Sequence, residues 1–118
     1  MNTRSRVCRV LAVFQGELAD VLARLPDRVG EMPRAAICQV VAIDLFGVVY
    51  GAEAARPAIK RAGGGAIVVT ASLAGLSPMA GDPGYSVAKG GAIAFVRSMA
   101  PRLAAEGITI SAICPGFA

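Results

Sequence analysis

Two short apolar runs, AIVVT at residues 66–70 and ITISAIC at residues 108–114, flank a longer segment of helical character. Continuous apolar runs of this length, rich in β-branched residues, are typical of strands buried on both faces of a parallel sheet. Between them, residues 85–106 repeat apolar side chains at three- and four-residue steps, and Gly107 is well placed to end the predicted helix. The order strand, helix, strand predicts a right-handed parallel crossover.

An alanine-rich apolar stretch, residues 34–61, precedes the first run and is long enough for a helix of seven turns. Gly47 and Gly51 lie one turn apart on one face, where close approach of a second backbone would offset their low helix propensity. Pro57 is expected to disturb the last turns. Gly63 to Gly65 follow the helix and precede a strand, which favours a helix cap and tight turn over a phosphate-binding loop.

The length of 118 residues indicates one α/β domain over residues 1–118. Residues 1–33 are its least informative part, since their apolar side chains recur at helical spacing but are interrupted by Gly16. Residues 73–84 contain several glycines and prolines, and we expect them to be irregular.

Composition excludes several classes of function. The chain has no histidine, which removes a Ser-His-Asp triad, and Cys8, Cys38 and Cys114 are too widely spaced for a zinc site or a disulfide framework. We therefore expect no metal and a reducing cytoplasm. The net charge of +4 is scattered without interleaved aromatics, so no nucleic-acid partner is predicted. Acidic and polar residues interrupt every run before the ~18 residues that a membrane span needs.

Three polar residues in the centre of the chain indicate a reaction class. Ser72 follows the first strand, at the sheet edge where ligands bind in open α/β sheets, while Tyr85 and Lys89 share one helix face. A phenol has a pKa of about 10, and a nearby ammonium favours the phenolate. Such a tyrosine can exchange a proton with an alcohol or carbonyl oxygen that the serine also holds. The trio predicts carbonyl–alcohol interconversion, with the hydride supplied by a cofactor.

Each of these features is weak by itself, because Tyr–Lys pairs at this spacing are common on exposed helices. The complete arrangement is more informative: Ser72, twelve residues, Tyr85, three residues, Lys89, a helix, a strand and then Pro115-Gly116. The segments IVVTASLAG, YSVAK and ICPG resemble the active-site serine, the Y-x-x-x-K segment and the following Pro-Gly of the short-chain dehydrogenase/reductase family. The resemblance covers residues 34–118.

The resemblance implies a role for each matching residue. Tyr85 would be the general acid/base, and Lys89 would favour the phenolate and hold the nicotinamide ribose. Ser72 would position the substrate carbonyl, and Pro115 and Gly116 would lie along the nicotinamide. The implied cofactor is NAD or NADP, and the implied substrate is a small alcohol or ketone.

Asp44 is a further candidate with two interpretations. The family usually has an asparagine of a proton-relay network at this point, and an aspartate keeps the main-chain carbonyl but adds a charge. Asp44 can equally be a solvent-facing acid on an amphipathic helix.

The sequence contains neither the family's T-G-x-x-x-G-x-G turn nor its N-N-A-G segment. We therefore expect a truncated, partial Rossmann-like, doubly wound parallel sheet without the N-terminal dinucleotide-binding half. Such a chain is expected to bind NAD(P) weakly or not at all. Two hypotheses remain open. One is an oxidoreductase. The other is a non-catalytic module that associates through its two long helices, which are also the expected homo-oligomer interface.

Overall fold

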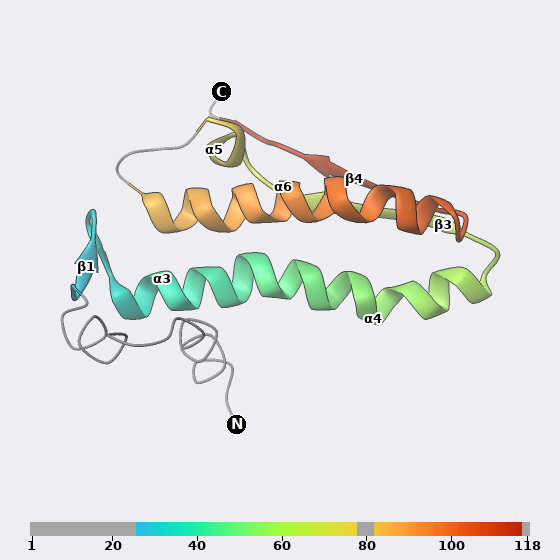
Figure 1. The fold of residues 1–118 in the computed structure, drawn as a ribbon, viewed down its shortest axis with the longest axis horizontal. Helices are drawn as coiled ribbons and strands as arrows, with labels where there is room; N and C mark the ends of the chain where they lie inside the picture. Colours follow the sequence, from blue (N-terminus) through green and yellow to red (C-terminus); the bar gives the residue numbers. More distant parts are fainter. Residues whose placement is uncertain (1–25, 78–81, 117–118) are drawn as a thin grey trace, which may run out of the picture.

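The computed structural model describes residues 26–77 and 82–116 (Figure 1). The helical periodicity expected before residue 26, together with Cys8, lies outside the described residues. The described part begins with a short antiparallel hairpin, in which β1 (Arg28–Val29) pairs with β2 (Met32–Pro33). This hairpin leads directly into the long helical stretch.

The helical stretch consists of α3 (Arg34–Val40), η2 (Val41–Phe46) and α4 (Gly47–Arg61). The predicted helix over residues 34–61 is confirmed in extent, and Pro57 lies inside α4. The six central residues wind as a π-helix, which was not predicted, because apolar spacing does not distinguish an i→i+5 turn from its neighbours. Asp44 belongs to this π-helical segment.

The second half of the chain forms β3 (Gly65–Thr70), α5 (Leu73–Leu76), α6 (Pro83–Ala104) and β4 (Ile108–Ile113). β3 and β4 pair in parallel, with a register that runs from Gly65 opposite Ile108 to Thr70 opposite Ile113. The predicted parallel crossover is therefore confirmed.

The irregular structure expected for residues 73–84 is wrong in part, because residues 73–76 form one helical turn. Ser72 caps this turn, since its Oγ accepts a hydrogen bond from the Ala74 amide at 3.2 Å. The following helix also begins two residues earlier than expected, at Pro83, where Asp82 is the cap and proline suits the first helical position.

The helix α6 lies between the sheet and the long helical stretch and packs on both (Figure 1). Side chains from β3, β4 and one side of α6 form the core, in which Leu103 and Ile108 are fully buried. The other buried members are Val69, Ala92, Val96 and Ile110. The opposite face of the sheet is exposed at Val68.

The glycines before β3 form the predicted cap and turn. Gly63 and Gly64 have φ angles of 92° and 114°, a region that L side chains rarely adopt. A Cβ at Gly64 would lie 2.5 Å from the carbonyl oxygen of Gly107, so the two turns at this end of the sheet meet backbone to backbone.

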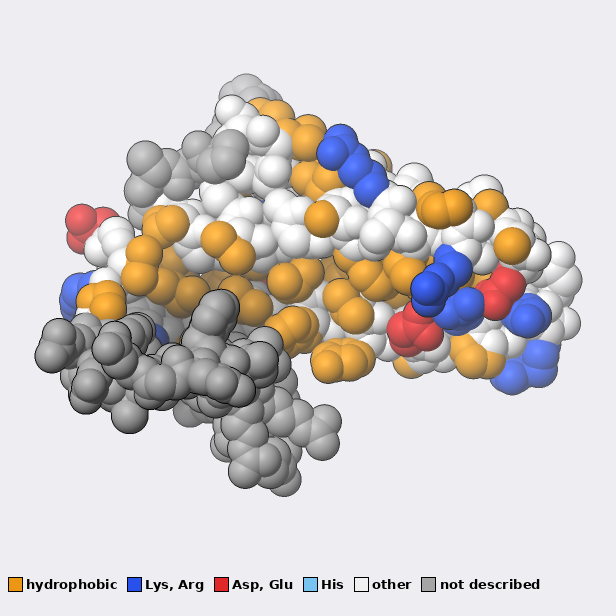
Figure 2. Space-filling model, viewed as in Figure 1, with side chains coloured by type: hydrophobic (Ala, Val, Ile, Leu, Met, Phe, Trp, Pro, Cys, Tyr) orange, Lys and Arg blue, Asp and Glu red, His pale blue; other side chains and the backbone are white. Residues whose placement is uncertain are grey.

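Gly47 and Gly51 do not have the close neighbour that their spacing suggested. Apart from the adjacent residues and the backbone of the same helix, no described atom lies within 4 Å of a Cβ built at either position. The face around them is apolar and exposed, with Ile43 and Tyr50 exposed to 62% and 65%. Hydrophobic side chains form a band along this stretch in Figure 2.

The described helix over Arg34–Arg61 is 28 residues long and contains an 18-residue window with a mean hydropathy of 1.8, so it meets the length and composition criteria for a membrane span. Core helices of soluble proteins and signal sequences meet the same criteria. The absence of a membrane partner therefore stays a prediction.

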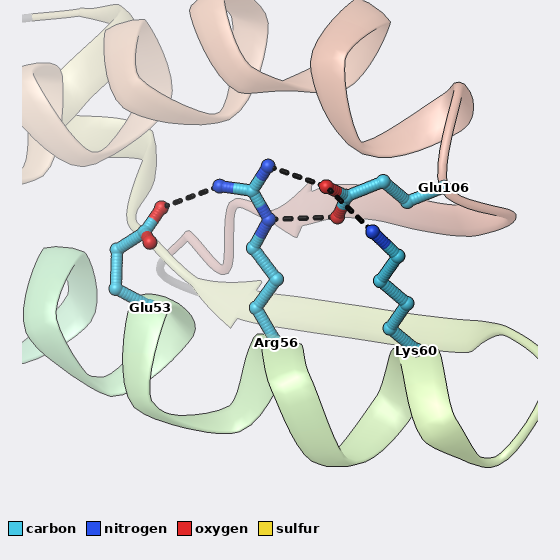
Figure 3. Close-up of polar contacts among 4 residues, drawn as sticks. All are labelled: Glu53, Arg56, Lys60 and Glu106. Carbon is cyan, nitrogen blue, oxygen red and sulfur yellow. Dashed lines mark hydrogen bonds and ion pairs between the residues drawn. The ribbon is translucent and has the colours of Figure 1, made fainter.

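An ion-pair network joins α4 to the turn after α6 (Figure 3). Arg56 donates two hydrogen bonds of 2.7 Å to the carboxylate of Glu106 and one of 3.2 Å to Glu53. Lys60 lies 3.8 Å from the same Glu106 carboxylate. The hydrogen bonds from Arg56 hold the pKa of Glu106 below its usual range.

This lowered pKa predicts an acid-dependent loss of stability. The contribution of Glu106 is complete above the unfolded-state pKa of about 4.3 and is lost as the pH falls through the lower folded-state value. We expect Glu106→Gln to lower the free energy of unfolding at neutral pH, and the difference from wild type to shrink in acid. Denaturant unfolding over a pH series measures this.

The exposed Glu31 provides the control, because its side chain makes no ion pair with the described residues. Glu31→Gln should change the free energy of unfolding little at any pH. A difference between wild type and Glu106→Gln that stays constant from neutral pH into acid would contradict the assignment.

Candidate active site

The first component of the site is the junction between β3 and α5. Ser72 follows the carboxyl end of β3 and is half-buried, with its Oγ bonded to the Ala74 amide. The amide of Leu73 donates to the carbonyl of Pro115 at 2.9 Å, which joins this junction to the chain leaving β4. Ser72 and Pro115 thus meet at the carboxyl edge of the sheet.

The second component is the first part of α6. The carboxylate of Asp82 accepts a hydrogen bond from the Tyr85 amide at 3.2 Å, which fixes the turn that carries Tyr85. One turn later, the Lys89 ammonium lies 5.7 Å from the centre of the Tyr85 ring, within the range of a cation–π interaction. Lys89 Nζ also donates to the Thr70 carbonyl at 3.2 Å and so links α6 to the end of β3.

Residues of both components line a cavity of about 400 Å³. Ser72, Tyr85, Pro115 and Gly116 all line it, so four of the six residues singled out in the sequence share one site. The other lining residues are Leu73, Ala74 and Ser77. Among the described lining residues, none carries a charged side chain and three carry hydroxyls.

The remaining two candidates lie outside the lining. Lys89 contacts the ring of Tyr85. Asp44, in the π-helical segment, is not among the lining residues, and its side chain makes no hydrogen bond or ion pair with the described residues. Its predicted part in a proton relay stays a prediction.

Sequence reasoning missed three features of the site. Leu73 and Ser77 line the cavity because α5 is helical, and nothing in a glycine- and proline-rich stretch indicated that turn. The acceptor of the Lys89 hydrogen bond is a main-chain carbonyl, which carries no sequence signal. Asp82 could have been found, since an aspartate directly before proline is a typical helix start.

A parallel strand–helix–strand unit with a hydroxyl-lined cavity at the carboxyl ends of its strands is the arrangement of an open-sheet α/β protein, in which ligands bind at this edge of the sheet. The model of the short chain dehydrogenase family matches residues 24–118. The chain belongs to this family, and the predicted partial Rossmann-like fold is confirmed.

Individual relatives agree with this assignment. The chain is 46% identical over 78 residues to the short-chain dehydrogenase/reductase prx7 of Penicillium rubens, a match to 63% of this chain and 28% of the relative. It is 40% identical over 88 residues to cis-4-hydroxycyclohexanecarboxylate dehydrogenase of Sinomonas cyclohexanicum, a match to 75% of this chain and 35% of the relative.

Among solved structures, acetoin dehydrogenase of Salmonella typhimurium superposes with a TM-score of 0.69 at 25% identity, over 85% of this chain and 46% of that one. The chain spans about a third of the length of the curated relatives that it matches.

Proposed function

We propose that the cavity is the reaction site of an NAD(P)-linked oxidoreductase that interconverts an alcohol and a carbonyl compound. The observation that carries this proposal is the arrangement of two hydroxyls, from Ser72 and Tyr85, around one cavity, with the Lys89 ammonium against the Tyr85 ring. This is the set of groups needed to hold a reacting oxygen and to move a proton to or from it.

The hydrogen bonds of the site support a separate role for each of its polar residues. Ser72 Oγ accepts from the Ala74 amide, which leaves its own proton free to donate to the reacting oxygen. Tyr85 then gives a proton to the oxygen during reduction and takes one during oxidation. Lys89, held by the Thr70 carbonyl, places its ammonium group against the Tyr85 ring.

The residues present fit the nicotinamide end of NAD or NADP. The cavity volume of about 400 Å³ falls in the range of small-ligand sites, Pro115 and Gly116 provide one wall, and Lys89 can donate to ribose hydroxyls. When bound, this cofactor supplies the hydride. Because the sequence contains no T-G-x-x-x-G-x-G turn, we expect the binding of NAD(P) by this chain to be weak.

The described lining residues favour a small substrate without charge. No charged side chain among the described lining residues could pair with a carboxylate or an ammonium, and Leu73, Ala74 and Pro115 provide apolar surface. A relative acts, by its name, on a hydroxycyclohexane carboxylate. Cyclohexanol therefore combines the ring of that substrate with the absence of charge that this cavity favours.

The test is turnover of cyclohexanol by the purified chain with NAD or NADP at millimolar concentration, followed by the absorbance of the reduced nicotinamide. We expect a rate that depends on the protein, the alcohol and the cofactor. If the rate does not exceed that of the buffer with either cofactor, the proposal is contradicted and a non-catalytic association module is favoured.

The second candidate is a non-catalytic association module. The exposed apolar face that carries Ile43 and Tyr50, with open space beside Gly47 and Gly51, supports it. The same face supports a homo-oligomer through the long helices under either candidate. A cytoplasmic location is also proposed, supported by the free thiols of Cys38 and Cys114.

A further inference from the structure

The four-residue helix α5 rests directly on the backbone of α6 at Gly75. A Cβ built at Gly75 would lie 2.7 Å from the carbonyl carbon of Lys89 and 2.8 Å from the amide nitrogen of Gly90. Real Cβ atoms essentially never approach other heavy atoms so closely. The contact meets main chain and not the end of a flexible side chain, so neither partner can move aside cheaply.

The contact involves the two segments that carry the reactive hydroxyls. Gly75 follows Ser72 by three residues within one short turn, in which the Gly75 amide donates to the Ser72 carbonyl at 3.0 Å. On the other side, Lys89 follows Tyr85 by one turn of α6. The separation of α5 from α6 at Gly75 therefore bears on the distance between Ser72 and Tyr85, which both line the cavity.

We infer that Gly75 is a positioning residue, whose missing side chain sets the distance between Ser72 and Tyr85 through the packing of α5 on α6. The expected effect of Gly75 on turnover rests on the proposed function. The role of Gly75 in setting the distance between Ser72 and Tyr85 does not.

Backbone conformation does not provide a competing reason for glycine at this position. The glycines with positive φ among the described residues are Gly30, Gly63, Gly64 and Gly107, and Gly75 is not among them. Alanine can therefore adopt the backbone angles of residue 75, and the expected effect of Gly75→Ala arises from the contact alone.

The same interface provides a matched control at Gly90. A Cβ built there would lie 3.5 Å from the carbonyl oxygen of Gly75, which is ordinary van der Waals contact. Gly90→Ala thus adds the same methyl group on the opposite side of the same contact without forcing the helices apart. Alanine is also the better helix former at this position in α6.

The chain has only two tyrosines, Tyr50 and Tyr85, which makes the geometry directly measurable. In protein labelled with fluorotyrosine, fluorine NMR gives two signals, assigned with Tyr50→Phe and Tyr85→Phe. We expect Gly75→Ala to shift the Tyr85 signal and leave that of Tyr50 in place, and Gly90→Ala to leave both in place. An unmoved Tyr85 signal in Gly75→Ala, or an equal shift in Gly90→Ala, would overturn the inference.

A measurement on the unmodified chain covers the case in which Gly75→Ala fails to fold. The α-protons of Gly75 should show a strong nuclear Overhauser effect to the amide proton of Gly90, and its absence would overturn the contact. In the turnover assay, Gly75→Ala should lower kcat by roughly 10²-fold, as expected for a misplacement of about 1 Å. A shifted Tyr85 signal with unchanged kcat would overturn the positioning role, whereas an inactive wild type would refute the proposed function and leave the NMR result decisive.

Discussion

Replacing Tyr85 with phenylalanine should lower the rate of cyclohexanol oxidation by about 10²- to 10⁴-fold, the usual contribution of a positioned general acid/base. The substitution removes the hydroxyl of Tyr85, which lines the cavity and whose ring lies against the Lys89 ammonium. The ring and its cation–π contact stay, so the loss should fall on the chemical step. Steady-state kinetics with saturating cofactor measures it.

Tyr50→Phe is the matched control, since it makes the same change at the other tyrosine. The Tyr50 side chain is 65% exposed on α4 and does not line the cavity. It should keep the wild-type rate. A Tyr85→Phe variant that turns over as fast as Tyr50→Phe would remove Tyr85 from the mechanism.

Leu103→Ala should lower the free energy of unfolding by about 2 to 5 kcal/mol, the range for deleting a buried leucine side chain. Leu103 is 1% exposed and belongs to the core between α6 and the sheet, together with Ile108 and Val69. A loss of this size is a large share of the ~5 to 15 kcal/mol that stabilises a typical domain. Equilibrium unfolding in urea measures it.

The comparison for this prediction is Val87→Ala on the same helix. Val87 is 62% exposed, and its truncation should change the free energy of unfolding by no more than about 0.5 kcal/mol. Equal urea midpoints for the two variants would show that α6 does not pack on the sheet as described.

The sheet and its crossover could be predicted because the pattern of the strands is local. The runs beginning at residues 66 and 108 are uncharged and rich in β-branched residues, and they became β3 and β4. The turn at Gly63 and Gly64 could also be predicted. These glycines follow a helix and precede a strand, whereas a phosphate-binding loop follows a strand and precedes a helix.

The features that escaped prediction have no distinct local pattern in the sequence. The π-helical turn at residues 41–46 has the same apolar spacing as the α-helix around it. The turn α5 forms because Ser72 caps it and Gly75 packs on α6. Neither contact can be inferred from a stretch rich in glycine and proline, which are residues that usually interrupt helices. Gly47 and Gly51 predicted a close neighbour that the described chain does not provide.

The sequence predicted two of the residues that contribute hydroxyls to the candidate site, but fewer of the residues that complete the lining of the cavity. Ser72 and Tyr85 were found from spacing and chemistry, and the cavity unites them with Pro115 and Gly116. Ser77 entered the lining only because α5 is helical.

Hydride transfer itself tests the central claim most directly. The wild-type chain is given cyclohexanone and a reduced nicotinamide cofactor that carries deuterium at its transferable position, and the cyclohexanol formed is analysed by mass spectrometry. We expect deuterium on the carbinol carbon with wild type and almost none with Tyr85→Phe. Cyclohexanol without deuterium, or no more labelled product than forms without protein, would contradict the claim.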